Sequence, residues 1–206
     1  MLLDDGADEL GSALQEADDI SKVVLSGNGM TAEGVHSLCF KLAQTAIQSL
    51  SITGVERGAN AYMSNKVQGK GGRGIAKMLT AQHTELKTLV LSGANVGDDG
   101  IAAIAKGLAR NSVLTTLDLH RNQITDAGAV LLARALATAT GLELLIMTAN
   151  RLTDEGVHAL AEAVKQHPSI RVLDCDMNSK VTKEAKAALA AALAGPRGYG
   201  VSHEEL

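Results

Sequence analysis

The stretch LTTLDLHRN, residues 114–122, decides the fold of this chain, because its leucines follow the pattern apolar-x-x-apolar-x-apolar. The pattern occurs in five further copies, which begin at Ile20, Ile47, Leu86, Leu142 and Ile170. From Leu86 onward, each copy begins 28 residues after the one before it. Self-similarity at a fixed period of about 20–50 residues is typical of a repeat protein, so we expect six structural repeats.

Each copy divides into a predicted strand and a predicted helix. Residues 117–119 alternate apolar and polar side chains, as a half-buried strand does, and the apolar residues of 130–136 follow at helical spacing. Thr153, Asp154 and Glu155 precede one helical half, where a hydroxyl caps free N–H groups and acids suit the positive end of the helix dipole. A glycine opens the helical half at Gly34, Gly74, Gly100, Gly128 and Gly156.

Stacking such units bends the molecule. Neighbouring strands lie about 4.8 Å apart, whereas packed helices need about 10 Å. The helical side of the stack must therefore be longer than the strand side. We expect an α/β solenoid in the shape of a curved horseshoe arc, with a parallel β-sheet on the concave face and α-helices on the convex face.

These repeats resemble the leucine-rich repeats, specifically the ribonuclease-inhibitor-like type with about 28 residues per unit. The resemblance covers essentially the whole chain. It implies an asparagine turned inward to hydrogen-bond the neighbouring coil, which matches at Asn28, Asn122, Asn150 and Asn178. The chain departs from this pattern at Val55 and Ala94, so the backbone ladder should be irregular there, with Asn95 as a possible substitute.

We interpret residues 1–206 as a single leucine-rich repeat domain. Residues 1–19 have the pattern of a helical half-repeat without its strand, which leaves two alternatives: a dedicated cap helix, or the start of a fragment of a longer solenoid. The 39 residues between Ile47 and Leu86 exceed one repeat by about 11, which places an insertion at about 55–73. Residues 197–206 are expected to form a mobile tail.

Composition excludes several classes of function. A net charge of −4 and a pI near 5.8 disfavour general nucleic-acid binding. The sequence contains no signal-peptide pattern and no apolar run of the roughly 20 residues that a membrane span requires. The sequence has two cysteines, Cys39 and Cys175, which lie far apart, whereas a secreted domain of this kind usually carries more, so we expect a reducing compartment and a cytoplasmic protein. Both occupy apolar positions, which predicts buried thiols. We favour a monomer, although the sequence leaves the oligomeric state open.

The exposed columns of the predicted sheet supply the candidate binding site. Alternate strand residues face away from the core. In the second half of the stack these include aliphatic residues beside acids and a histidine, which is typical of a surface that binds a protein, here one with basic character. Strand preference alone is the alternative explanation for the aliphatic residues. The candidate residues are Asp118, His120, Leu144, Ile146, Thr148, Val172, Asp174 and Asp176.

The same residues do not predict a metal site. Asp118 and His120 lie two strands, about 10 Å, from Asp174 and Asp176, whereas metal ligands need distances of about 2.0–2.2 Å. We expect no metal, no cofactor and no catalytic residue. The histidines at 36, 83, 158 and 167 are expected at the surface.

The insertion is a second candidate contact region, because it is locally basic and rich in glycine. Its candidate contact residues are Tyr62, Lys66, Lys70 and Arg73. Residues 69–74 match G-x-G-x-x-G, but the following strand lacks the acid that a dinucleotide-binding fold requires. Two interpretations remain, a solvated loop and a helix start that binds an anion or an acidic partner segment.

The predicted function is a non-catalytic module that binds another protein through the concave sheet, with help from the insertion. The resemblance implies this, because ribonuclease-inhibitor-like proteins mostly work as protein-binding scaffolds, sensors or regulators. Two alternatives remain: a GTPase activator of the kind that acts on Ran, and a fragment of a larger sensor or structural assembly. No residue of an activator's catalytic loop maps onto this sequence.

Overall fold

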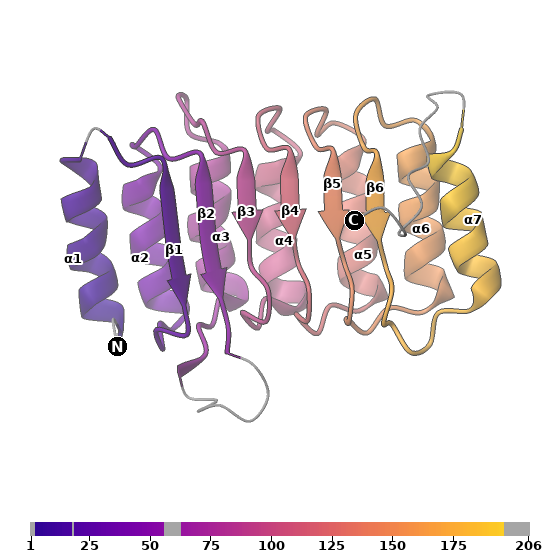
Figure 1. The fold of residues 1–206 in the computed structure, drawn as a ribbon, viewed down its shortest axis with the longest axis horizontal. Helices are drawn as coiled ribbons and strands as arrows, with labels where there is room; N and C mark the ends of the chain where they lie inside the picture. Colours follow the sequence, from indigo (N-terminus) through magenta and orange to yellow (C-terminus); the bar gives the residue numbers. More distant parts are fainter. Residues whose placement is uncertain (1–2, 18, 56–62, 196–206) are drawn as a thin grey trace.

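The structure is a computed structural model that describes residues 3–17, 19–55 and 63–195. Strands and helices alternate along the described chain, and the six strands pair in chain order into one parallel sheet (Figure 1). The strands are β1 (Lys22–Ser26), β2 (Ser49–Thr53), β3 (Thr88–Val90), β4 (Thr116–Asp118), β5 (Leu144–Ile146) and β6 (Val172–Asp174). The helices are α1 (Leu3–Gln15), α2 (Ala32–Leu42), α3 (Gln68–Leu79), α4 (Gly97–Leu108), α5 (Asp126–Leu136), α6 (Asp154–Lys165) and α7 (Lys183–Leu193). The predicted α/β solenoid is confirmed.

All seven described helices lie on one side of the sheet, and the other side, the open sheet face, carries no helix (Figure 1). The register places equivalent residues of successive repeats beside one another, so that Leu117 pairs with Leu89 on one side and Leu145 on the other. Each repeat therefore adds one strand and one helix in the same relative position. Equivalent outward-facing positions of successive strands therefore form rows that run across the open sheet face.

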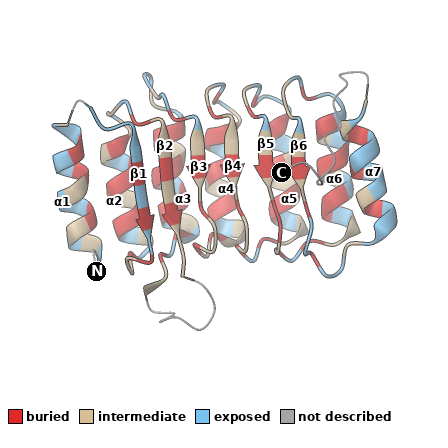
Figure 2. Cartoon of the chain, viewed as in Figure 1, coloured by how far each residue is buried: buried red, intermediate tan, exposed pale blue. Residues whose placement is uncertain are grey.

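The core lies between the sheet and the helices (Figure 2). Leu117 and Leu119 are both fully buried, and the side chain of Asp118 between them points to the open sheet face. The buried hydrophobic residues include no Phe, Tyr or Trp among the described residues, and Phe40 is 49% exposed. Aliphatic side chains fill the core, and each fully buried leucine contributes about 1.5–3 kcal/mol relative to an exposed one.

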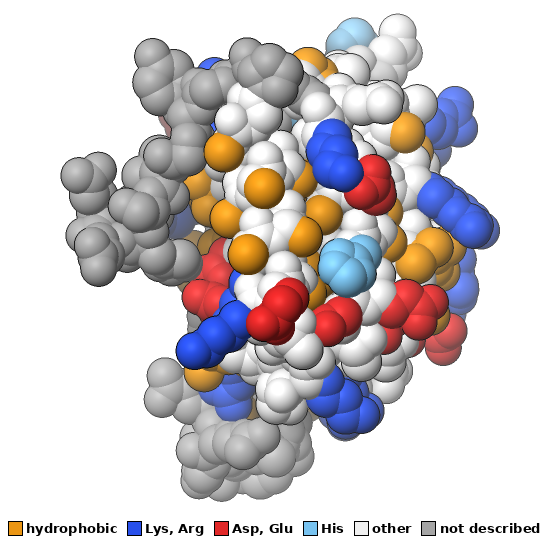
Figure 3. Space-filling model, turned by 90° about the vertical axis from the view of Figure 1, so that its right-hand side faces the viewer, with side chains coloured by type: hydrophobic (Ala, Val, Ile, Leu, Met, Phe, Trp, Pro, Cys, Tyr) orange, Lys and Arg blue, Asp and Glu red, His pale blue; other side chains and the backbone are white. Residues whose placement is uncertain are grey.

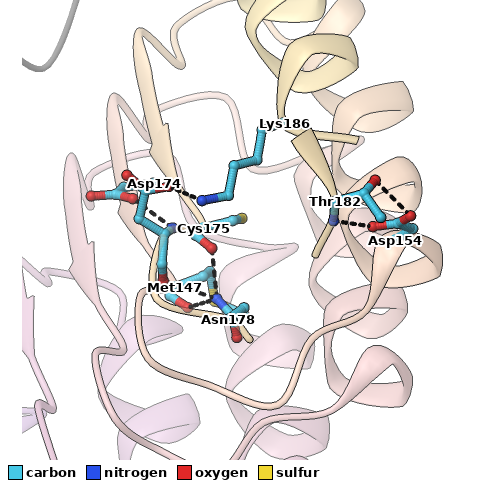
Figure 4. A network of polar contacts seen from close by, with 8 residues as sticks. Met147, Asp154, Asp174, Cys175, Asn178, Thr182 and Lys186 are labelled. Carbon is cyan, nitrogen blue, oxygen red and sulfur yellow. Dashed lines mark hydrogen bonds and ion pairs between the residues drawn. The ribbon is translucent and has the colours of Figure 1, made fainter. Parts of the chain in front are cut away.

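Asparagines join successive repeats. The Oδ1 atom of Asn150 accepts hydrogen bonds from the backbone N–H groups of Asn122 and Ile124, at 2.9 and 3.1 Å. Its Nδ2 atom donates to the carbonyl of Leu119 at 2.9 Å. Asn178 repeats the arrangement one coil later, where its amide donates to the carbonyls of Met147 and Cys175 (Figure 4). The inward role that the resemblance implied is confirmed for Asn122, Asn150 and Asn178. It is wrong for Asn28, whose amide donates to the carbonyl of Ser26 in its own turn.

The ladder is less disturbed near the insertion than we predicted. Asn65 takes the role that Val55 cannot fill: it accepts from the backbone N–H of Met30 and donates to the carbonyl of Leu25. At Ala94, the backbone carbonyl itself accepts the N–H of Val67 at 2.8 Å. The suggestion that Asn95 substitutes for the missing asparagine is wrong, because its side chain accepts a hydrogen bond from Gln123 instead.

A second ladder joins the helix starts. Thr153 caps α6, and its backbone N–H and hydroxyl both donate to the carboxylate of Asp126 in the previous helix, at 2.8 and 2.7 Å. The same carboxylate–threonine pair joins Asp154 to Thr182, as Figure 4 shows. It also joins two further pairs of neighbouring helices, through Asp98 and Thr125 and through Asp4 and Thr31. These contacts fix the angle at which each helix leaves its loop.

The insertion ends earlier than the predicted limit at residue 73. Helix α3 begins at Gln68, so Lys70 and Arg73 lie on a helix and not in a loop. Gly71 donates to the carbonyl of Val67 as Gly100 donates to that of Val96, which makes Gly71, and not Gly74, the equivalent of the other repeat glycines. Glycine lowers helix propensity, which made this segment resemble a loop.

The glycines of α3 are there because the neighbouring helices come close. A Cβ atom at Gly72 would lie 2.7 Å from the carbonyl oxygen of Gly100 in α4. A Cβ atom at Gly74 would lie 2.8 Å from the backbone of His36 in α2. Tertiary packing on both sides therefore overrides the low helix propensity of the segment.

Helix α7 forms the last layer of the described stack, and Figure 3 looks onto this end. Small hydrophobic side chains gather in the middle of the visible face, with charged side chains around them. The exposed alanines at this end are Ala187, Ala188, Ala190 and Ala191 of α7 and Ala194, which caps its C-terminus. The predicted tail at 197–206 lies outside the described residues.

Candidate functional site

Strand register assembles most of the predicted concave site into adjacent rows of the open sheet face. Leu144 lies between Thr116 and Val172 in one row. Ile146 lies between Asp118 and Asp174 in the next row. Three aliphatic side chains, Leu144, Ile146 and Val172, therefore occupy neighbouring positions on β5 and β6, bordered by two carboxylates. We call these three aliphatic residues together with the two carboxylates the aliphatic patch; its members are Asp118, Leu144, Ile146, Val172 and Asp174.

The residues that follow the strands form a polar border along the patch. The Nδ1 atom of His120 lies 2.6 Å from the hydroxyl oxygen of Thr148. The carboxylate of Asp118 accepts hydrogen bonds from the backbone N–H of His120 and from the hydroxyl of Ser92, both at 2.8 Å. His120 and Thr148 are thus held in place by their neighbours. Thr148 is only 8% exposed, so its role is to fix His120 and not to offer a large contact area.

The acidic character of the site is weaker than the sequence suggests. Asp176 forms an ion pair with Lys186 of α7, with 2.6 Å between the carboxylate oxygen and Nζ. Asp174 accepts a hydrogen bond from the backbone N–H of Asp176 at 2.9 Å. The lysine, which sequence reasoning did not place here, comes from the next helix and offsets one of the three negative charges at this end of the sheet.

The aliphatic residues of the patch are less exposed than two other apolar residues, Val24 and Met177. Leu144, Ile146 and Val172 are partly exposed, because neighbouring columns cover their sides. Val24 and Met177 are more exposed, at 54% and 74%. Sequence reasoning missed Met177, which lies in the turn after β6, beside the predicted site.

The insertion candidates are not gathered into one site. Lys66 lies in the loop before α3, whereas Lys70 and Arg73 lie on the helix, and all three are exposed. Lys70 forms an ion pair with Glu33 of α2, which reduces its capacity to attract an anion. Tyr62 lies outside the described residues. The G-x-G-x-x-G match lies within α3 and its glycines serve helix packing, so it does not form a phosphate loop.

The two thiols have structural surroundings. Cys39 and Cys175 are both buried and free, as predicted. Burial raises the pKa of each thiol to about 12, which disfavours the reactive thiolate. Within the described residues, no group of three or more His, Cys, Asp or Glu residues is placed to hold a metal ion. The helices of the described chain are all too short or too polar to cross a membrane.

The expected surface position is wrong for His167. Its side chain is 2% exposed, and its Nε2 atom lies 2.6 Å from the carbonyl oxygen of Ala139 in the previous repeat. Its Nδ1 atom accepts from the backbone N–H groups of Ser169 and Ile170. His167 is therefore a buried residue that joins two neighbouring repeats through its contact with Ala139.

Comparison with known proteins agrees with this geometry. A family model described as Leucine Rich repeat matches residues 82–105 and 110–133, which span the loop before β3 through α5. The two matched segments are therefore leucine-rich repeats. Whether these repeats are of the ribonuclease-inhibitor-like type stays a prediction.

Two solved structures are similar to this chain. The leiomodin-1 domain named actin-binding site 2 has a TM-score of 0.56 and 16% sequence identity, and the match covers 91% of this chain and 87% of that one. The tropomodulin C-terminal domain of Caenorhabditis elegans has a TM-score of 0.49 and 12% identity, over 91% and 90% of the two chains. No curated protein sequence matches the chain.

Proposed function

We propose that this chain is a non-catalytic module that binds another protein through the aliphatic patch on its open sheet face. The observation that carries the proposal is the adjacency of Leu144, Ile146 and Val172 on a face that none of the described helices covers. Aliphatic side chains that gather on an uncovered face favour contact with a partner, because burying them removes apolar surface from water.

The scaffold supports binding because it is already ordered. The sheet ladder and the asparagine ladder hold the backbone of β4–β6, and no buried side-chain polar atom of the described residues lacks a hydrogen-bond partner. A preformed surface loses little conformational entropy when it binds. The patch therefore needs no rearrangement to accept a partner.

The carboxylates beside the aliphatic residues determine which kind of partner the patch favours. Asp118 and Asp174 flank Ile146, and carboxylates beside an aliphatic centre favour a partner with basic side chains at its rim. Asp176 already pairs with Lys186, so this preference rests mainly on Asp118. We therefore expect an apolar contact at Ile146 that is supported by an ion pair.

The comparison with leiomodin-1 supports the coarser part of the proposal, since a domain of the same fold is named for binding a protein, actin. Purified actin is accordingly one candidate to include in a binding test. The GTPase-activator alternative is tested separately by GTP hydrolysis with Ran-type GTPases. Stimulation of hydrolysis would overturn the non-catalytic proposal in favour of that alternative.

The proposal is tested by affinity capture from native lysate followed by mass spectrometry. Three proteins are compared: the wild type, Ile146→Arg, and Ser51→Arg, which places the same charge in the same row three strands away. We expect one or more partners to be lost with Ile146→Arg and kept with Ser51→Arg. Partners that both variants retain would contradict binding at the patch.

A further inference from the structure

One column of residues at the carboxyl edge of the sheet has an unusual backbone. Gly93, Arg121, Ala149 and Met177 follow one another at intervals of 28 residues, and their φ angles are +66°, +54°, +55° and +58°. The turns after β3, β4, β5 and β6 thus adopt the left-handed conformation at this position, which glycine adopts without steric cost and other residues do not. The last three repeats carry side chains where glycine would suit the fold better.

These side chains line a groove. A cavity of about 890 Å³ opens between the turns after β4, β5 and β6, and it is lined by His120, Arg121, Gln123, Ala149, Asn150, Arg151 and Met177. Met177 is 74% exposed, the largest exposure among the large hydrophobic side chains of the described chain. The groove is next to the border of the aliphatic patch, because His120 belongs to both.

The groove is positively charged. Neither Arg121 nor Arg151 forms an ion pair with a carboxylate of the described residues. The Nη2 atom of Arg151 donates to Oε1 of Gln123 at 2.8 Å, and Nε2 of Gln123 donates to Oδ1 of Asn95 at 2.8 Å. This chain of side chains crosses three repeats and orients the Arg151 guanidinium, while its other N–H groups remain available for a carboxylate.

We propose that this groove binds an acidic, extended segment of a partner protein. Carboxylates of the segment pair with Arg121 and Arg151, since a guanidinium binds a carboxylate through two parallel hydrogen bonds. An apolar side chain of the same segment covers Met177 and removes its exposed surface from water. The inference rests on the proposed function in that the chain binds proteins, but it assigns a separate edge with the opposite charge preference.

The left-handed backbone provides variants that remove side chains without harming the turn. Arg121→Gly and Met177→Gly delete one charge and the apolar contact, while glycine adopts the observed φ angles without strain. Arg171→Gln is the matched control, because it removes an exposed arginine that precedes β6 at the opposite end of the strands. Thermal unfolding followed by circular dichroism verifies that the three variants and the wild type fold alike.

The test measures fluorescence anisotropy with two labelled peptides, one in which glutamates flank a pair of leucines and one with lysine in place of each glutamate. The wild type should bind the glutamate peptide, and its affinity should fall as the salt concentration is raised. It should not bind the lysine peptide. Arg121→Gly and Met177→Gly should each weaken binding of the glutamate peptide at least about tenfold, which corresponds to the loss of one charge-assisted or apolar contact. Arg171→Gln should bind as the wild type does.

Failure of this inference is distinguishable from failure of the proposed function. Equal binding of both peptides, no binding of the glutamate peptide, or an equal loss in Arg171→Gln would overturn the groove. The Ile146→Arg variant should still bind the glutamate peptide, because the substitution lies on the sheet face and not in the groove. A partner lost with Ile146→Arg, together with a groove that binds no peptide, would leave the aliphatic patch in place and remove only the groove.

Discussion

Replacing Asn150 with alanine should destabilise the fold strongly, because this side chain satisfies backbone groups that have no other partner. The N–H groups of Asn122 and Ile124 both donate to Oδ1 of Asn150. The carbonyl of Leu119 accepts from Nδ2. In Asn150→Ala these three buried groups lose their hydrogen bonds and their access to water remains blocked.

The expected loss follows from the number of groups. A buried backbone group without a partner costs about 1–3 kcal/mol, so three groups cost about 3–6 kcal/mol after some relaxation. Domains of this size are stable by about 5–15 kcal/mol, so the variant should lose a large part of its stability or fail to fold at 37 °C. Asn150→Asp, which keeps the acceptor and loses the donor, should lie between alanine and the wild type.

Urea denaturation followed by circular dichroism measures this difference. Asn28→Ala is the matched control, because Asn28 holds the same repeat position and donates only to the carbonyl of Ser26 in its own turn. We expect a loss below about 1 kcal/mol for the control. If Asn150→Ala and Asn28→Ala have the same small effect, the asparagine ladder does not hold the repeats together and the reasoning is refuted.

Three further predictions concern stability and reactivity. Hydrogen bonds from the backbone and hydroxyl of Thr182 lower the pKa of Asp154, so the stability this carboxylate provides is present above the usual carboxyl range and is lost as pH falls through its lowered pKa. Thermal unfolding between neutral and acidic pH should therefore show a smaller acid effect in Asp154→Asn than in the wild type. The thiols of Cys39 and Cys175 should react with a thiol reagent only on unfolding, because burial raises the pKa of both to about 12, and fast reaction of the native protein would contradict this. Gly72→Ala should lower the unfolding midpoint, since its Cβ would lie 2.7 Å from a backbone oxygen of α4, and an unchanged midpoint would show that α3 and α4 can move apart.

The regular part of the fold could be predicted from the sequence because each position of the repeat has one physical role. The positions of Leu117 and Leu119 hold buried apolar residues in every repeat, and the residue between them faces the open side. The apolar pattern of a single copy is a weak indication of a strand, but its recurrence in every repeat makes the prediction of the fold strong. The strand register, and with it the aliphatic patch, followed from the spacing alone.

The irregular part could not be predicted in the same way. Because of the insertion, the inward asparagine of this repeat is Asn65, which the fixed repeat spacing does not identify. The glycines of α3 resemble a loop because local propensity disfavours glycine in a helix, and only the close approach of α2 and α4 explains them.

The groove beside the patch also lay beyond sequence reasoning. The sequence does not reveal the φ angle of a methionine. The left-handed conformation of Met177 and its exposure therefore appear only in the structure. That Arg121 and Arg151 form no ion pair with a carboxylate of the described residues likewise depends on which carboxylates the fold brings near. Lys186, which does find a partner in Asp176, comes from the following helix.

The central claim is that the open sheet face, and not the helical side, contacts a partner protein. Site-specific photocrosslinking tests it most directly, with a photoreactive residue at position 146 on β5 or at position 163 on α6. The account predicts a crosslink to a captured partner from position 146 and none from position 163. A crosslink from position 163 alone would contradict it.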